Sequence, residues 1–167
     1  MKRGGQILGL PLILVFSLIV GAFILLYGAK VILDLSEEAD YVSFLERLDD
    51  LDATLRTFEN YDSGSSKVYA LDIPKDIETI CFYGESSTGS CTLDGGVCPV
   101  ELEEELALVL DPEYNIYIFP QGVYDRTRFT LEEFQTIEGD PICVSQGGSI
   151  VLSSQKDFVG VAYDEPA

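Results

Sequence analysis

The sequence of 167 residues has no histidine and no tryptophan, and it has only one methionine. Without histidine the chain lacks the commonest general base and cannot build a Ser-His or Cys-His nucleophile. Acidic pairs such as Glu132-Glu133 occur, but 29 acidic residues give such pairs by chance. Gly147-Gly148 lacks the lysine that a phosphate-binding loop needs. We therefore expect no enzyme, no catalytic residues and no cofactor.

Acidic residues are absent before Asp34, and no charge of either sign lies between Arg3 and Lys30. All 29 Asp and Glu residues lie after Ala29, with eight of the ten basic residues, so this part has a net charge of −21. Such a surface repels phosphate groups, and we expect no nucleic-acid partner. Solvation of an exposed surface is the simplest explanation of the charge; binding of divalent ions and a high-salt environment are the alternatives.

The uncharged stretch contains an apolar run from Ile7 to Ala29. As an α-helix this run would extend about 35 Å, enough to cross a hydrocarbon core of about 30 Å. We expect a transmembrane helix over 7–29. A cleavable signal peptide has a shorter apolar region and a small residue where this chain has Tyr27, so we expect no cleavage there. Basic Lys2 and Arg3 favour the cytoplasmic side for residues 1–6. We therefore expect a single-pass protein of the cell membrane whose C-terminal domain is extracytoplasmic.

The residues before the apolar run are a basic pair, Lys2-Arg3, then glycines and then Gln6. This start resembles the class III signal of archaeal type IV pilin-like proteins, in which the prepilin peptidase cuts between Gly and Gln. The resemblance covers about 30 residues. It implies a cut between Gly5 and Gln6 that leaves the helix as an N-terminal anchor. The fifth mature position, often Glu in pilins, is Leu10 here, and similar starts occur on archaeal membrane-anchored proteins of unassigned role.

Small residues follow one face of the expected transmembrane helix. Ser17, Gly21 and Gly28 are spaced by four and seven positions. Such a stripe allows helices to approach closely, which suits self-association or contact with another membrane subunit. Glycine is also common in membrane helices in general, so both interpretations stay open.

No glycine or proline occurs between Lys30 and Gly64, so we expect the helix to continue as an amphipathic stalk over 30–61. Its apolar residues recur at spacings of three and four and form what we call the seam: Tyr41, Phe44, Leu48, Leu51, Leu55 and Phe58. We expect the seam to pack on the strands of its own domain; a coiled coil between subunits is the alternative. The acidic residues of 49–52 lack the glycine and glutamate of an EF-hand loop and are interpreted as a solvated helix face.

Beyond the turn-forming residues 62–66 the pattern changes to short β-rich runs. We expect strands at 67–73, 77–83, 115–119 and 158–163, and a hairpin of 142–144 with 149–152. We expect a polar loop at 84–99. Residues 101–110 form a helix or an amphipathic strand, and their apolar spacing favours a helix. The predicted fold class is α+β. A long N-terminal transmembrane and stalk helix precedes a small, disulfide-stapled domain of antiparallel strands over 67–163.

Four cysteines lie in the expected outer domain, and none lies in the apolar run. Two disulfides in an oxidising compartment fit this number, although spacing leaves three pairings open. We favour Cys91 with Cys98 inside the polar loop, and Cys81 with Cys143 because both have strand-like neighbours. The absence of histidine and of a C-x-x-C pair disfavours zinc, so we expect no metal site.

Two functional hypotheses follow from these features. The chain is a pilin-like structural protein that assembles through its N-terminal helix, or it is a tethered binding or accessory module of a membrane complex that forms no filament. An exposed aromatic surface made by Tyr114, Tyr117, Phe119 and Tyr124 would suit the second hypothesis. The alternation of residues in 116–119 instead favours a strand with both faces covered.

Overall fold

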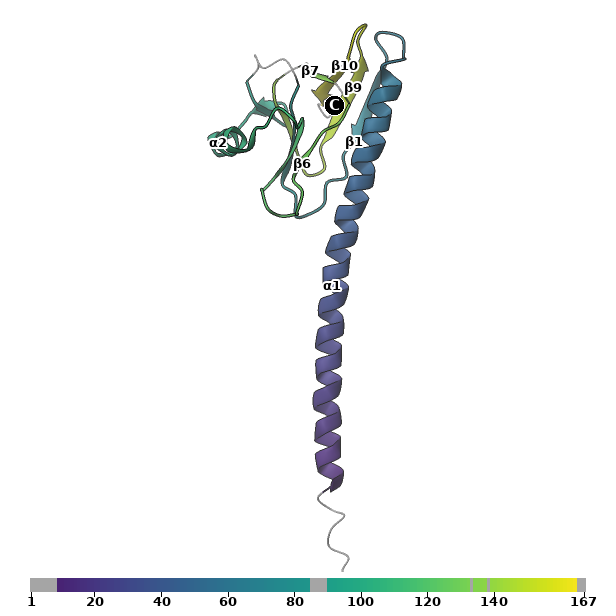
Figure 1. Cartoon of the computed structure of the whole chain (residues 1–167), viewed down its shortest axis with the longest axis vertical. Coiled ribbons are helices and arrows are strands. Elements are labelled where there is room, and N and C mark those ends of the chain that lie inside the picture. The colour runs from purple at the N-terminus through teal and green to yellow at the C-terminus, as the bar shows by residue number, and fades with distance from the viewer. Residues whose placement is uncertain (1–8, 85–89, 133, 138, 165–167) are drawn as a thin grey trace, which may run out of the picture. The chain divides into compact units, whose positions relative to one another are not determined.

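The computed structural model describes residues 9–84, 90–132, 134–137 and 139–164, except for the side chains of 9–11 and 34–38. The chain divides into two compact units, Met1–Val42 and Ser43–Ala167. Helix α1 (Gly9–Phe58) begins in the first unit and ends in the second (Figure 1). Its 50 residues confirm that the helix continues past Lys30 without a break.

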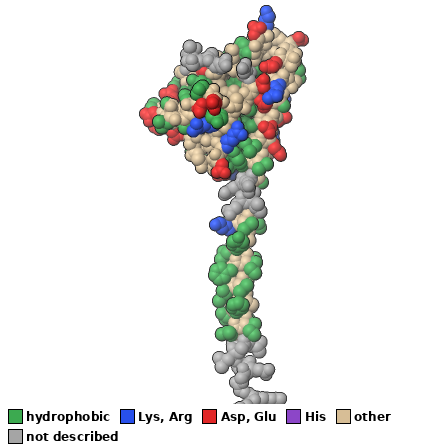
Figure 2. Space-filling model, viewed as in Figure 1, with side chains coloured by type: hydrophobic (Ala, Val, Ile, Leu, Met, Phe, Trp, Pro, Cys, Tyr) green, Lys and Arg blue, Asp and Glu red, His purple; other side chains and the backbone are tan. Residues whose placement is uncertain are grey.

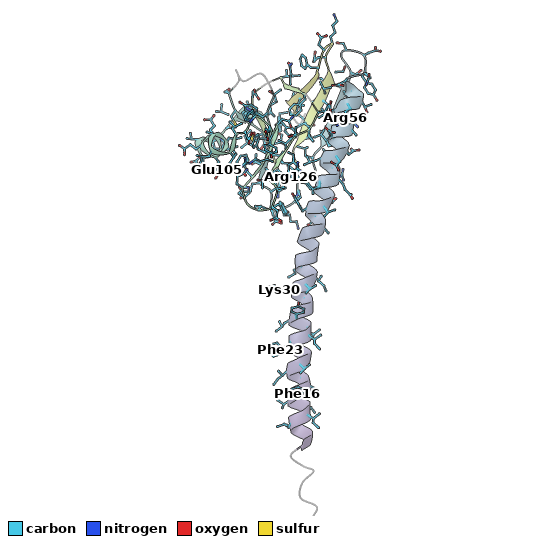
Figure 3. All side chains as sticks on the ribbon, in the orientation of Figure 1. Phe16, Phe23, Lys30, Arg56, Glu105 and Arg126 are labelled. Carbon is cyan, nitrogen blue, oxygen red and sulfur yellow. A yellow bond between two sulfur atoms is a disulfide. The ribbon has the colours of Figure 1, made fainter. Side chains whose placement is uncertain are left out.

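The described part of the first unit is helical, and its side chains are almost all apolar. The segment Leu12–Leu33 has a mean hydropathy of 2.6, and by length and composition it is the one helical segment among the described residues that could cross a membrane. None of this segment is buried within the chain. Figure 2 shows hydrophobic side chains covering the face of this helix in view, and Figure 3 shows Phe16 and Phe23 pointing outward from it.

The part of α1 in the second unit, from Ser43 to Phe58, buries one face. Each seam residue in this part is 1–4% exposed: Phe44, Leu48, Leu51, Leu55 and Phe58. The expectation that the seam packs within its own domain is therefore confirmed for these residues. Tyr41, which belongs to the first unit, is of intermediate exposure.

Polar contacts also join this part of α1 to the rest of the second unit. The Tyr69 hydroxyl donates to Asp50 Oδ2 at 2.9 Å, and the Glu132 backbone N–H donates to Asp52 Oδ1 at 2.6 Å. Arg56 lies between two carboxylates, at 2.9 Å from Asp52 and 3.0 Å from Glu132. Burial and the Asp50 carboxylate raise the pKa of Tyr69, which stays a donor. Asp50 and Asp52 therefore attach the helix to the domain and are more than a solvated face.

One sheet has four strands in the order β1-β9-β10-β7. Strands β1 (Ser66–Ala70), β9 (Ser149–Ser154) and β10 (Val159–Tyr163) pair antiparallel, and β7 (Gln135–Thr136) pairs parallel with β10. Along β9 the buried residues alternate with partly exposed ones, as expected for a strand with one covered face. Figure 1 shows β1 and β9 beside the last turns of α1.

The other sheet has six strands in the order β4-β3-β8-β2-β5-β6. Its central strands β2 (Thr79–Phe82) and β5 (Ile116–Phe119) have every residue buried. This confirms the expected strand with both faces covered and contradicts an exposed aromatic surface, because Tyr117 and Phe119 are 0% and 3% exposed. The remaining strands of this sheet are β3 (Thr92–Leu93), β4 (Gly96–Val97), β6 (Arg128–Phe129) and β8 (Ile142–Ser145).

The predicted hairpin of 142–144 with 149–152 is wrong. Strand β8 pairs with β2 and β3, whereas β9 pairs with β1 and β10, so the two strands belong to different sheets. The turn between them has Gly147 at φ 77°. A Cβ at Gly148 would lie 2.3 Å from Val144 Cγ1. These glycines let the chain bend sharply from one sheet to the other.

The polar loop predicted at 84–99 contains a short hairpin in its described part. Strands β3 and β4 are joined by Asp94-Gly95, both with positive φ. Two such residues form a tight hairpin turn, for which Asp-Gly is a preferred pair. Helix α2 (Val100–Val109) follows and confirms the favoured helix.

Candidate functional site

The first candidate surface is the apolar segment of α1. A Cβ added at Gly21 or Gly28 would meet no described atom within 4 Å, and Ser17 donates its hydroxyl to the Leu14 carbonyl at 2.9 Å. The small-residue stripe is thus open in the single chain. Gly5 and Gln6, where the pilin-like cut was predicted, lie outside the described residues.

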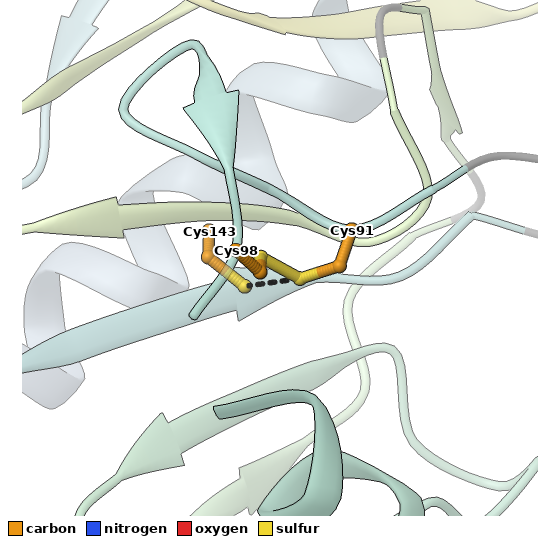
Figure 4. Close-up of side chains that lie close together, drawn as sticks. All are labelled: Cys91, Cys98 and Cys143. Carbon is orange, nitrogen blue, oxygen red and sulfur yellow. Dashed lines mark hydrogen bonds between the residues drawn. A yellow bond between two sulfur atoms is a disulfide. The ribbon is translucent and has the colours of Figure 1, made fainter. Parts of the chain in front are cut away.

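The second candidate is the group of four cysteines in the second unit. The disulfides are Cys81–Cys143 and Cys91–Cys98, which are the predicted pairings. Cys81 and Cys143 face each other directly on the paired strands β2 and β8. Cys91 Sγ lies only 3.9 Å from Cys143 Sγ, as the dashed line in Figure 4 shows. The spacing of the cysteines along the chain did not indicate this contact between the two disulfides.

Three of these sulfurs, from Cys91, Cys98 and Cys143, lie within 4.8 Å of one another, the separation that a metal site requires. Metal binding by cysteine needs thiolates. Here every cysteine is bonded to another cysteine, so none is a free thiolate. The cluster as it stands is therefore a pair of disulfides in contact.

Apolar side chains cover the disulfides. The buried group around them includes Leu106 of α2 together with Tyr117 and Phe119 of β5, and Tyr83 and Tyr114 pack against it. Leu106 is buried on the inner face of α2, whereas acidic residues such as Glu105 lie on its exposed side (Figure 3). The predicted 3.6-residue spacing of this helix thus serves to cover the sulfur cluster.

The third candidate is an open cleft of about 650 Å³ at the end of α2. Its floor and walls are formed by the segment after α2, by the end of β2 and by the segment after β6. The lining residues include Tyr83, Asp111, Glu113, Tyr114, Thr130 and Phe134. Aromatic rings beside two carboxylates make a cleft that is partly apolar and negatively charged.

Internal hydrogen bonds fix the walls of this cleft. The Tyr117 hydroxyl donates to the Asp111 carbonyl at 2.7 Å and accepts from the Asp111 N–H at 2.9 Å. Burial raises the pKa of Tyr117, which keeps its donor proton. The Asn115 side chain accepts from the Leu131 N–H and donates to the Leu131 carbonyl. The walls of the cleft are therefore held by hydrogen bonds between lining residues and by the buried Tyr117 beneath them.

A buried carboxylate, Asp140, lies in the segment before β8. Its Oδ1 accepts from the Gly84 N–H at 2.9 Å. Its Oδ2 and the hydroxyl of Thr136 are buried and make no well-formed hydrogen bond among the described residues, although the Thr136 hydroxyl is near enough to lower the pKa of Asp140. Burial raises the pKa of Asp140, and the Gly84 N–H partly opposes that shift. Nothing in the spacing of acidic residues distinguished Asp140 from the other 28.

The sequence thus identified the residues of the helix surface and of the disulfides, but it did not identify the cleft. The cleft is made by segments that are far apart in sequence, and its walls contain no recognisable motif. Comparison of the chain with protein-family models, with curated proteins and with solved structures found no match. The apolar segment of α1, the disulfides and the cleft are therefore the features from which a function can be inferred.

Proposed function

We propose that this chain is a single-pass, membrane-anchored extracytoplasmic structural protein of pilin-like type. The segment Leu12–Leu33 is the anchor, and Ser43–Ala167 is the outer unit. One observation carries the proposal: α1 is a single helix whose first part is apolar and exposed all round, while its later part has an apolar face buried in a folded unit. A helix that is apolar on every side requires a nonpolar environment, and a bilayer provides one.

Three features support the outward orientation of the folded unit. Its four cysteines are all paired, which fits an oxidising compartment. Basic residues precede the apolar segment, at Lys2 and Arg3, and such residues favour the cytoplasmic side. The acidic residues all follow the segment, and a strongly acidic exterior keeps exposed units soluble.

The anchor is tested by paired arginine substitutions in the two parts of α1. Ile19→Arg with Phe23→Arg adds two charges to the apolar segment, each costing about 3 kcal/mol near a bilayer centre. We expect an alkaline wash to release this variant from membranes and to leave the unaltered chain in the pellet. Ala53→Arg with Thr57→Arg is the matched control, since both positions are exposed and have the same spacing. Equal release of the two variants from membranes contradicts the proposal that Leu12–Leu33 anchors the chain.

The pilin-like part of the proposal concerns processing and assembly. We expect mass spectrometry of the mature chain to find an N-terminus at Gln6, and microscopy of isolated surface material to show filaments that contain the protein. Recovery of the mature protein with Lys2 still present contradicts the processing step. The stripe of Ser17, Gly21 and Gly28 is the surface that we expect to mediate self-association.

A tethered binding or accessory module is the second candidate, and the cleft beside Tyr83 and Tyr114 favours it. A filament subunit needs no such cleft, whereas a binding module needs a concave surface with a few polar groups. Recovery of the protein only as dispersed membrane complexes, with no filament, favours this second candidate over the first. Both candidates retain the same anchor.

A further inference from the structure

We propose that the two disulfides form a thiol–disulfide exchange site that accepts electrons from an external dithiol. Cys91 is the nucleophile, Cys143 carries the sulfur that is attacked, and Cys81 is the leaving group. This role is independent of the membrane anchor and of filament assembly. It depends on four side chains of the second unit and on the elements that hold them together.

The geometry that carries the proposal is the 3.9 Å separation between Cys91 Sγ and Cys143 Sγ. Both sulfurs are bonded to other sulfurs and carry no hydrogen, so the approach is a van der Waals contact between two disulfides. Figure 4 shows the Cys91 sulfur facing the Cys143 sulfur. Exchange proceeds when a thiolate attacks a disulfide sulfur, so the attacking and accepting atoms are already neighbours.

The backbone holds these two cysteines on adjacent segments. Strands β3 and β8 run parallel, with Thr92 paired with Ile142 and Leu93 with Cys143. The Thr92 N–H donates to the Pro141 carbonyl, and the Asp94 N–H donates to the Cys143 carbonyl, both at 3.0 Å. The Cys98 N–H donates to the Cys91 carbonyl at 3.2 Å, so the backbone of Cys91 is also held, and forming a new bond requires its side chain to move toward Cys143.

The two disulfides differ in their access to a reductant. Cys91 and Cys98 are 5% and 6% exposed, and Cys98 lies between exposed Val97 and Pro99. Cys81 and Cys143 are both 0% exposed. A dithiol therefore reaches the Cys91–Cys98 bond first. The Cys81–Cys143 disulfide has no exposed surface, and the Cys91 sulfur is in contact with it.

The reaction has two steps that balance. In the first, the dithiol is oxidised to its disulfide, and Cys91–Cys98 is reduced to two thiols. In the second, the Cys91 thiolate forms a bond to Cys143 Sγ, the Cys81–Cys143 bond breaks, and the electron pair leaves on Cys81, which takes up the proton that Cys91 lost. The product contains a Cys91–Cys143 disulfide and thiols at Cys81 and Cys98.

Single serine substitutions in the full chain, purified in detergent, test the second step without a reductant. Cys98→Ser leaves the Cys91 thiol beside the buried disulfide, and Cys91→Ser is the matched control, which leaves Cys98 unpaired. Free thiols are alkylated, and the chain is digested with an endoproteinase that cleaves after Glu and Asp, which places the four cysteines on separate peptides through Glu85, Asp94 and Glu101. We expect a Cys91–Cys143 peptide and alkylated Cys81 in the Cys98→Ser variant. In the control the Cys98 sulfur still lies within 4.8 Å of Cys143, and we expect Cys81–Cys143 to rearrange more slowly than in the Cys98→Ser variant.

The rate of this exchange has a defined pH dependence. Since the thiolate is the attacking species, the rate should rise about tenfold per pH unit below the pKa of the attacking thiol. An intact Cys81–Cys143 bond in the folded Cys98→Ser variant overturns the proposal. Equal rearrangement in both variants overturns it as well, because that result describes shuffling without a preferred nucleophile.

If a variant does not fold, the exchange step is tested on the unaltered chain. Limited reduction by dithiothreitol is quenched by alkylation at intervals. We expect the first partly reduced species to carry alkyl groups on Cys81 and Cys98 and a bond between Cys91 and Cys143. Accumulation of a species that is alkylated only on Cys91 and Cys98 overturns the exchange step.

Discussion

The two parts of helix α1 have opposite environments although they belong to one continuous helix. In Leu12–Leu33 the side chains are apolar on all sides apart from Ser17 and Lys30, and none is buried by the chain. In Ser43–Phe58 the apolar residues occupy one face, and that face is buried while acidic and basic residues occupy the others. The same backbone conformation therefore occurs with two different patterns of side chains.

This difference shows that the pattern of side chains, and not the helix itself, determines what each part contacts. A narrow apolar face needs only one covering surface, which β-strands of the same unit provide. An apolar surface on every side needs a nonpolar environment, which the described part of this chain does not provide. The predictions below test the two parts with matched substitutions.

The largest expected effect is a difference in the free energy of unfolding between two Leu→Ala substitutions, one in each part of α1. Leu51→Ala removes a side chain that is 1% exposed, and the resulting cavity should lower the free energy of unfolding by about 2–5 kcal/mol. Leu25→Ala removes a side chain that is 75% exposed, and it should change that free energy by less than about 0.5 kcal/mol. Denaturant unfolding of the second unit, followed in detergent, measures both. Similar losses of unfolding free energy for the two variants would contradict the difference in environment between the two parts of α1.

A smaller effect is expected from the carboxylate that attaches the later part of α1. Asp52→Ala leaves the Glu132 N–H without its acceptor and removes one partner of Arg56, so it should cost about 1–3 kcal/mol. Asp49→Ala is the matched control, because Asp49 is an exposed carboxylate on the same helix. Its effect should stay within about 0.5 kcal/mol. Equal effects would mean that Asp52 belongs only to a solvated face.

The smallest effect concerns pH, and it belongs to the folded unit alone. Burial raises the pKa of Asp140 in the folded state, so folding favours the protonated carboxyl group. The stability of the unaltered chain should therefore fall, relative to Asp140→Asn, as pH rises through the range from about 4 to the raised value, and then level off. The asparagine variant keeps an oxygen that accepts from Gly84.

Unfolding curves recorded at several pH values measure this difference. Glu105→Gln controls for the loss of one negative charge, since Glu105 is exposed on α2. A constant difference between the unaltered chain and Asp140→Asn contradicts the raised pKa. Retention in the membrane should not follow this pH dependence, because no acidic residue lies in Leu12–Leu33.

Local patterns predicted the parts of the fold that depend on local chemistry. The spacing of Phe44, Leu48 and Leu51 indicated a buried helix face, and the alternation in 116–119 indicated a covered strand; both are observed. The strand-like neighbours of Cys81 and Cys143 indicated the longer disulfide. In each case the residues that determine the outcome lie within a few positions of one another or share one recognisable pattern.

Features that depend on distant partners were missed or were predicted wrongly. The runs at 142–144 and 149–152 are close in sequence, which suggested a hairpin, but they pair instead with partners that include β2 and β1, at least 60 residues earlier. The contact between the two disulfides and the cleft after α2 arise in the same way, from segments brought together by the whole fold. Asp140 differs from the other acidic residues only in its burial, which no local pattern encodes.

The most direct test of the proposed topology is labelling of lysines in intact cells with a membrane-impermeant amine reagent. Three of the five lysines, Lys67, Lys75 and Lys156, are exposed on the second unit, and Lys2 precedes the apolar segment. Peptide mapping should find the label on these three lysines in intact cells and none on Lys2. Protection of all three in intact cells, with labelling only after lysis, would contradict an anchored protein whose folded unit faces outward.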